Sequence, residues 1–181
     1  MELTQRQWVR IRHLFQNACH GTVRRGMKYA SIATVNQDGS PHVTPVGSLI
    51  LGDDRKGFYF EEFSRHMSRN LQQNQKVCIQ VVNDSYWFWL KALLLGKFSA
   101  PVGVRLIGTA GERRIATSEE IKKFRRMIGP FRVFKGCRLT WSKMNHVREI
   151  HFGAFEPIET GAWIQEQLKE LTGRDYGTGI E

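Results

Sequence analysis

The sequence predicts a mainly β fold, in which an antiparallel barrel of about six strands carries flanking helices. Three observations support this prediction. Segments with the alternation of strands follow one another through short turns, few segments are suited to long helices, and residues 36–40 (Asn-Gln-Asp-Gly-Ser) form a strong hairpin signal. The pattern therefore favours an antiparallel barrel over a sheet built from βαβ units.

Strands are predicted where apolar residues alternate with polar or small residues between turn signals. They occupy residues 31–36, 42–51, 57–61, 76–82, 102–115 and 147–158. The fifth strand contains Gly108 and Gly111, either of which can introduce a bulge. In the last strand, strict alternation places Phe155 on the side opposite Ile150 and Phe152.

Helices are predicted where apolar residues recur at helical spacing next to a start or stop signal. They occupy about residues 2–20, 65–74, 117–128 and 161–171. Ser64 precedes the second helix as an N-cap, Thr117 opens the third in a capping-box sequence, and Gly129 ends it. We therefore expect a single domain over 1–181, with a barrel at about 28–160 between two terminal helices and a mobile tail.

Length and composition indicate one globular domain. The chain has 181 residues, of which 41% are hydrophobic and 24% are charged, which suffices to bury a core. The most apolar segment, residues 86–95, has about half the length of a membrane-spanning helix and contains Lys91. The N-terminus lacks the apolar core of a signal peptide. Three widely spaced cysteines, Cys19, Cys78 and Cys137, fit reduced thiols, so we expect a cytoplasmic protein.

The net charge of +10 is unevenly distributed along the chain. Residues 84–143 contain 13 Lys/Arg against 4 Asp/Glu, whereas residues 144–181 contain 3 against 7. A basic block of this kind can attract nucleic acid, an acidic membrane or a phosphorylated small molecule. A solvated basic face without a specific partner explains most of these side chains equally well.

The start of the helix after Ser64 is a candidate anion site. Free backbone N–H groups and the helix dipole favour a phosphate there, and Arg65, His66 and Ser68 add donor groups. An ordinary capped surface helix is the more common explanation of such a sequence. Spacing alone does not separate the two interpretations.

No familiar catalytic or metal-binding motif occurs in the sequence. It contains no GxSxG, HExxH, P-loop or GxGxxG signature, and no convincing pair of nucleophile and base. His13 and His20 share a helical face near Cys19, but no further ligand completes a metal site. His146 and His151 lie five residues apart on one strand and so point to opposite faces. We therefore expect no metal site.

Residues 86–95 (Tyr-Trp-Phe-Trp-Leu-Lys-Ala-Leu-Leu-Leu) are unusually aromatic and apolar. A dimer interface or the wall of a ligand pocket explains them best, the protein core comes second, and a membrane-touching segment comes third. We accordingly expect no membrane partner.

Residues 29–83 carry a family resemblance. The matching pieces are the hairpin at 29–45, the strand Gly57-Phe-Tyr-Phe60, the segment 64–71 (Ser-Arg-His-Met-Ser-Arg-Asn-Leu), the following Asn74-Gln-Lys-Val77, and the later strand at 103–111 with its acidic helix start. By their order and spacing, the chain resembles the pyridoxamine 5'-phosphate oxidase-like FMN-binding split barrels.

The resemblance implies a homodimeric split barrel with FMN sites at the subunit interface. It assigns cofactor contacts to the return strand of the hairpin, the end of the next strand and the start of the short helix. These contacts are His42, Val43, Thr44, Pro45, Phe60, Glu61, Ser64, Arg65, His66 and Met67. The helix start would approach the FMN phosphate. A Lys is common in the family at the position of Met67, and Arg65, His66 or Arg69 would compensate for it here.

The resemblance further implies an oxidoreductase in which the flavin performs hydride chemistry on a small-molecule substrate. Residues 84–101 and 129–143 would shape the substrate side, with the candidates Trp87, Lys91, Arg105 and Trp141. The pyridoxal-phosphate-binding signature of the true oxidase is not recognisable, so oxidation of pyridoxamine phosphate is not expected. One alternative is a non-enzymatic barrel that binds another anionic or planar ligand, such as haem or a deazaflavin. A less favoured one is a basic nucleic-acid-binding protein, because no nucleic-acid module is recognised.

Overall fold

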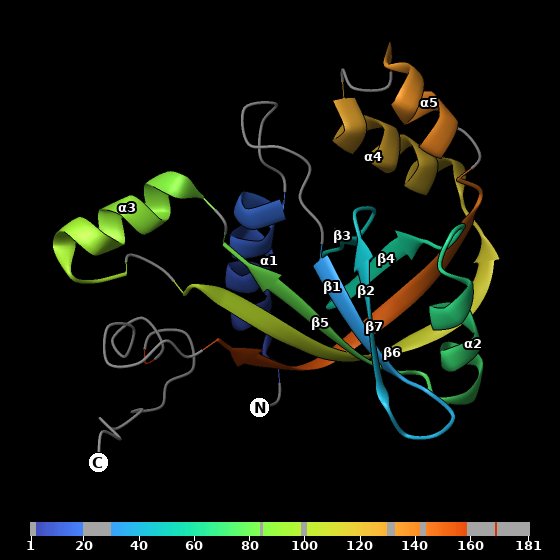
Figure 1. Ribbon diagram of the computed structural model, residues 1–181, viewed down its shortest axis with the longest axis horizontal. Coiled ribbons are helices and arrows are strands. Elements are labelled where there is room, and N and C mark those ends of the chain that lie inside the picture. Colours follow the sequence, from blue (N-terminus) through green and yellow to red (C-terminus); the bar gives the residue numbers. More distant parts are fainter. Residues whose placement is uncertain are drawn as a thin grey trace.

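The computed structural model describes residues 3–19, 30–83, 85–98, 101–129, 133–141, 144–158 and 169. Its centre is one seven-stranded antiparallel sheet in the order β2-β1-β5-β6-β7-β4-β3 (Figure 1). The strands are β1 (Ala30–Val35), β2 (Pro41–Val46), β3 (Ile50–Leu51), β4 (Lys56–Phe60), β5 (Lys76–Val82), β6 (Gly103–Ile115) and β7 (His146–Pro157). The described helices are α1 (Gln5–Cys19), α2 (Arg65–Gln73), α3 (Tyr86–Leu95), α4 (Ser118–Ile128) and α5 (Lys135–Trp141).

The hairpin of β1 and β2 confirms the prediction from the Asp-Gly turn. Gly39 has a positive φ of 83°, and its N–H donates to the carbonyl of Asn36 at 3.0 Å. Asp38 accepts a hydrogen bond from the backbone N–H of Ser40 at 2.9 Å. These contacts set the register in which Thr34 lies opposite His42 and Ile32 opposite Thr44.

The predicted return strand over 42–51 divides into β2 and β3, which accounts for seven strands where six were expected. β2 pairs with β1, whereas β3 pairs with β4, so the two pieces lie at opposite edges of the sheet. Ser48 lies at the break between them. Its hydroxyl donates to the carbonyl of Phe60 and accepts from the Phe60 N–H at 3.0 Å. This side chain thus makes the contacts that a continuous ladder would have supplied.

The long strands β6 and β7 are each interrupted once by a bulge. The register advances from Ala110 opposite Ile150 to Arg113 opposite Arg148, which leaves an extra residue on β6 near Gly111. It also passes from Ile107 opposite Ala154 to Gly108 opposite Phe152, which leaves an extra residue on β7. A bulge was expected near Gly108 or Gly111, and the prediction is confirmed.

The bulge on β7 changes which side chains face the core. Because Gly153 has no direct partner, alternation restarts after it, and Phe155 is fully buried together with Ile150 and Phe152. The prediction that Phe155 lies opposite these two residues is therefore wrong. At Gly108 a Cβ atom would lie 2.5 Å from the carbonyl oxygen of His151, so only glycine fits this crossing of β6 and β7.

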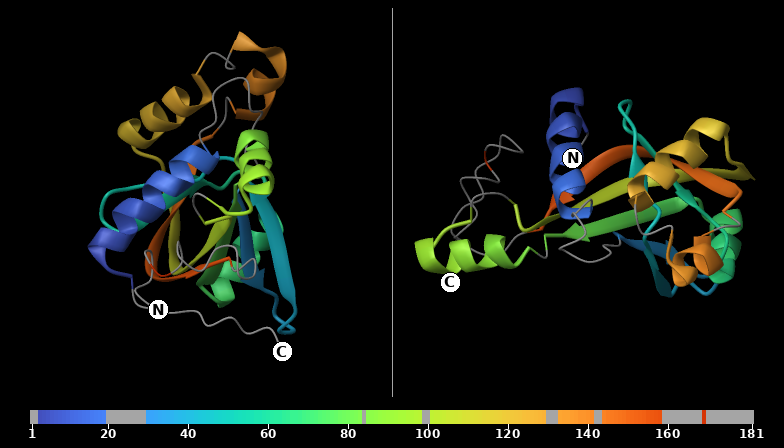
Figure 2. Two further views of the ribbon diagram at one scale, coloured as in Figure 1. Left: turned by 90° about the vertical axis from the view of Figure 1, so that its left-hand side faces the viewer. Right: turned by 90° about the horizontal axis from the view of Figure 1, so that it is seen from above.

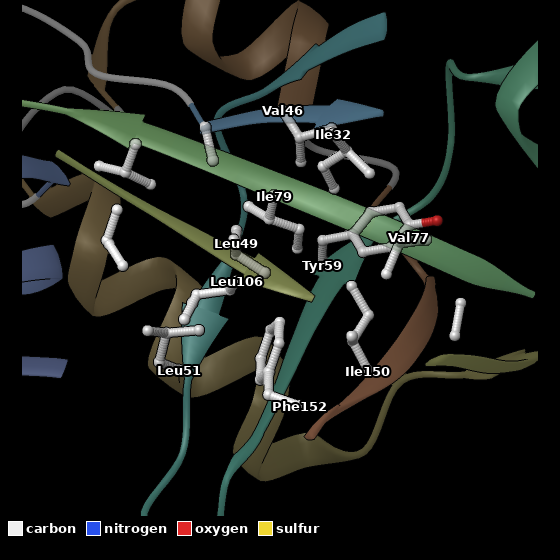
Figure 3. Close-up of a cluster of buried hydrophobic side chains, with 14 of the residues drawn as sticks. Ile32, Val46, Leu49, Leu51, Tyr59, Val77, Ile79, Leu106, Ile150 and Phe152 are labelled. Carbon is white, nitrogen blue, oxygen red and sulfur yellow. The ribbon is translucent and has the colours of Figure 1, made fainter. Parts of the chain in front are cut away.

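Two hydrophobic clusters lie on the two faces of β4. The larger one fills the barrel with side chains that converge from the strands, as Figure 3 shows for Ile32, Tyr59, Ile79, Leu106 and Ile150. Helix α1 closes it, because Trp8 stacks on Phe152 and donates through Nε1 to the carbonyl of Gly52. The smaller cluster joins Phe58 and Phe60 of β4 to Phe124 of α4, Met144 and Val147.

The helices agree with prediction in part. Helices α1, α2 and α4 lie where they were expected, and Thr117 and Glu120 form the predicted capping box. Helices α3 and α5 were not predicted, because the first is apolar on all sides and the second is one short segment. The predicted helix over 161–171 lies, apart from residue 169, outside the described residues, as does the tail. No helix of the described ranges is long and apolar enough to cross a membrane.

Candidate functional site

Two histidines from distant parts of the sequence meet where β2 passes the start of α2. The rings of His42 and His66 stack with centroids 4.3 Å apart and planes inclined by 21°. Thr44, two residues along β2, places its hydroxyl oxygen 3.4 Å from Nδ1 of His42. His66 is exposed and His42 half-buried, so one side of this stack is open to solvent.

Three polar residues hold His66 in this position. Its Nε2 lies 2.9 Å from Oδ1 of Asn36, an oxygen that can only accept, so this nitrogen carries the proton. Buried Asn70 donates to the same oxygen at 2.7 Å and to the hydroxyl of Thr34 at 3.1 Å. The hairpin turn is thereby tied to α2. This link was not predicted, although Asn70 lies in the segment 64–71 that carries the family resemblance.

The start of α2 is favourable for an anion. Ser64 occupies the N-cap position, but its side chain caps no backbone N–H group, and the first turn contains no acidic residue. Arg65 and Arg69 are one turn apart and exposed, and neither guanidinium group makes an ion pair or hydrogen bond with the described part of the chain. The N–H of Arg65 donates to the carbonyl of Phe63 at 3.1 Å, so the uncapped N–H groups of the first turn are those of His66 and Met67. They and the two guanidinium groups lie next to the histidine stack.

The other predicted cofactor contacts are divided between the interior and the outer surface. Met67 is fully buried in the barrel core, and Phe60 packs 4.7 Å from Phe124 in the smaller cluster. Val43 and Pro45 are exposed on the face of β2 opposite His42 and Thr44. Of the ten predicted contacts, the structure thus gathers His42, Thr44, Ser64, Arg65 and His66 at one place.

Glu61 is engaged inside the protein by a charge pair. Arg148 of β7 donates through Nε to both carboxylate oxygens, at 3.0 and 3.1 Å, and through Nη2 at 2.9 Å. The hydroxyl of Tyr59 donates to the same carboxylate at 2.8 Å. Burial, together with the negative charge of Glu61, raises the pKa of Tyr59 far above its usual range. Arg148 also donates to the carbonyl of Gly111, so the pair supports the bulge of β6.

The neighbouring carboxylate of Glu62 fixes the approach to α2. It accepts hydrogen bonds from the backbone N–H groups of Asn145 at 2.6 Å and His146 at 2.8 Å, and its oxygen lies 3.2 Å from Nδ1 of His146. Partial burial opposes ionisation, but these donors outweigh it and lower the pKa of Glu62. The last residues before α2 are therefore held against the start of β7.

The outward face of the sheet presents an apolar row across five strands. Pairing places five residues directly in register from β2 to β7, in the order Val43, Ala33, Cys78, Ile107 and Ala154. An outward face of an antiparallel sheet is ordinarily polar. Burial raises the pKa of the Cys78 thiol, so it stays protonated and adds to the apolar character of the row.

The four predicted substrate-side residues do not converge. Trp87 and Lys91 are exposed on α3, which projects past one end of the sheet, while α2 lies toward the other end (Figure 1). Arg105 is on β6, where it donates to Gln80 at 3.3 Å. Trp141 of α5 makes an edge contact with Phe124 at 6.2 Å. Within the described ranges, no group of three or more His, Cys, Asp or Glu side chains could hold a metal ion.

A family model described as pyridoxamine 5'-phosphate oxidase matches residues 21–137. This range includes β1 to β6 and the helices α2, α3 and α4, and therefore the histidine stack and the start of α2. No curated protein matches the sequence.

Solved structures with similar folds are related to the chain at low identity. HupZ of Group A Streptococcus is 21% identical and has a TM-score of 0.52, covering 88% of this chain and 97% of its own. An FMN-binding protein from Syntrophomonas wolfei is 13% identical with a TM-score of 0.51, covering 86% and 95%. An F420 reductase is 16% identical with a TM-score of 0.50, covering 71% and 88%. These likenesses support the split-barrel architecture.

Proposed function

Since the chain belongs to the pyridoxamine 5'-phosphate oxidase family, we propose that it is a flavoprotein that binds FMN and acts as an oxidoreductase on a small molecule. The single observation that carries the proposal is the stack of His42 and His66 beside the uncapped, cationic start of α2. A phosphate group needs N–H donors and positive charge, and a planar ring system needs a flat surface. This site offers all three.

Each residue has a separate task in this proposal. Arg65 and Arg69 would neutralise and bind the phosphate, helped by the uncapped N–H groups of His66 and Met67. His66, whose Nε2 proton is held by Asn36, would present its open ring side and its Nδ1 to the ligand. When bound, FMN would supply the hydride chemistry, and the protein would position it and exclude competing reactions.

We also propose a homodimer with flavin sites at the subunit interface. The apolar row from Val43 to Ala154 supports it, because an isologous interface needs a flat, self-complementary surface with few charges. We place the protein in the cytoplasm, which the free thiols of Cys78 and Cys137 support.

The test is an FMN titration of purified protein, followed by flavin absorbance and fluorescence. We expect saturable binding that weakens by about tenfold or more in the double variant Arg65→Gln/Arg69→Gln, because two charge-assisted phosphate contacts are lost. The matched control is Arg125→Gln/Arg126→Gln on α4, which removes the same charge from two exposed arginines elsewhere. Protein that ignores FMN, or equal weakening in both double variants, would contradict the proposal.

A second candidate function is a binding protein for haem or a deazaflavin on the same barrel. It is favoured by Met67, which is buried where the family commonly has a Lys, and by the exposed imidazole of His66. Parallel titrations with the three ligands separate the candidates. Stronger retention of haem or of the deazaflavin than of FMN would replace the first proposal.

A further inference from the structure

Helix α3 carries a stripe of large apolar side chains that the protein leaves uncovered. Tyr86, Leu90 and Leu94 follow one another at intervals of four residues, so they lie on one face, and Trp87 and Leu93 flank them. Leu90, in the middle, is half-buried, and the other four side chains are exposed. Tyr86 is 71% exposed, Trp87 69%, Leu93 67% and Leu94 76%. Contiguous exposure of this kind marks an interaction surface.

The opposite face of α3 packs against the segment that follows the helix and leads into β6. Ala92 is buried and forms a small cluster with Phe98 and Val102, against which Phe88 and Trp89 pack. Trp89 donates through Nε1 to the carbonyl of Asn83 at 2.8 Å. The orientation of the helix is therefore set, and the stripe is presented outward without any rearrangement.

The charges beside the stripe are all positive. Lys91 and Lys97 are exposed, and no residue in the described range 85–98 is acidic. Pairing α3 with the α3 of a second copy would still bring together an excess of positive charge, because residues 84–98 contain two lysines and one aspartate, Asp84. An anionic partner would instead offset them.

We propose that α3 binds in the surface of an anionic lipid membrane. Leucine side chains would enter the acyl boundary, Tyr86 and Trp87 would lie at the headgroup level, and Lys91 and Lys97 would contact the anionic headgroups. A helix of ten residues is too short to span the bilayer, so it lies in the interface. This proposal places first the interpretation that was ranked last from sequence, and the positive charges beside the stripe are the reason.

This contact would leave the candidate cofactor site accessible. Both Figure 1 and the right-hand view of Figure 2 place α3 at one end of the molecule and α2 with α4 at the other. The protein would thus be held at a membrane by one end while the histidine stack at the other end stays open to small molecules. The inference does not depend on FMN binding and can be tested without it.

The experiment measures co-sedimentation of the full chain with vesicles of phosphatidylcholine alone or with phosphatidylglycerol added. We expect binding to the anionic vesicles, weakened by high salt, and reduced about tenfold by Leu94→Glu. The matched control is Leu139→Glu on α5, a leucine that is 73% exposed at the other end of the molecule. The control variant should bind as the unmodified chain does.

Two outcomes would overturn the proposal. One is failure of the full chain to sediment with anionic vesicles at low salt. The other is a fall in the mass measured by light scattering when Leu94→Glu is introduced, with vesicle binding unchanged, because the stripe would then be covered by a second copy. Circular dichroism of both variants checks that each is folded.

Discussion

Arg148 of β7 and the two arginines of α2, Arg65 and Arg69, differ in whether the protein supplies their counter-charge. Arg148 is buried and engaged by Glu61 through three hydrogen bonds, whereas Arg65 and Arg69 are exposed and unpaired within the described residues. A buried charge without a partner is strongly destabilising, so the pairing of Arg148 with Glu61 serves the stability of the fold. Arg65 and Arg69 remain in water, so leaving them without a protein partner costs the fold no stability. Their guanidinium groups are therefore available to a ligand.

The largest expected effect comes from breaking the buried pair. Arg148→Met should lower the free energy of unfolding by about 3–5 kcal/mol, because the buried carboxylate of Glu61 would lose three hydrogen bonds from Arg148. It would keep only the Tyr59 hydroxyl and the more distant Arg113, at 3.8 Å. Urea denaturation followed by tryptophan fluorescence measures this. The double variant Glu61→Leu/Arg148→Met should regain part of the loss, since it removes both charges. A double variant less stable than Arg148→Met alone would show that the pair is not coupled as described.

A smaller, pH-dependent effect is expected at Glu62. Because its pKa is lowered in the folded protein from 4.5, the ionised form stabilises the fold above about pH 4.5, and this stabilisation is lost as the pH falls through the folded pKa. Glu62→Gln should therefore cost about 1–3 kcal/mol at pH 7 and progressively less in acid. Urea denaturation at a series of pH values measures the difference in the free energy of unfolding between this variant and the unmodified chain. A difference that stays constant into acid would contradict the lowered pKa of Glu62.

The smallest effect on stability is expected at the start of α2. Arg65→Gln/Arg69→Gln should change the free energy of unfolding by less than about 0.5 kcal/mol, because exposed side chains without partners contribute little. The same denaturation measurement applies. A substantial loss of stability would mean that these arginines serve the fold, and the contrast with Arg148 would fail.

Elements with local signals were predictable from sequence, and elements set by distant contacts were not. The Asp-Gly turn and the Thr117 capping box depend on neighbouring residues, and both were found. The division of β2 from β3 depends on Ser48 reaching Phe60, twelve residues on. The change of facing at Phe155 depends on a bulge against β6, which alternation along one strand cannot reveal.

The candidate site shows the same division. The family resemblance identified His42 and His66 separately, but their stacking follows from the pairing of β1 with β2 and the packing of α2 on β1. The family resemblance assigned Glu61 to the cofactor, whereas its pairing with Arg148, 87 residues away, could not be recognised from sequence. The substrate-side candidates were chosen by composition, and composition carries no information on which end of the sheet a segment lies.

The edge strand β2 has a consequence for how this protein behaves at high concentration. Pro41 and Pro45 lack an N–H, and proline is tolerated in a strand where its nitrogen points away from the neighbouring ladder. Backbone N–H groups alternate in direction along a strand, so the backbone nitrogens of residues 41, 43 and 45 all point to the free edge of β2. Since the two prolines have no N–H, Val43 is the one of these three residues that can donate there. A foreign strand would find one N–H donor there instead of three, although the carbonyl groups of these residues still point outward. The two prolines thus protect the protein against growth into extended aggregates while leaving both faces of the strand free for function.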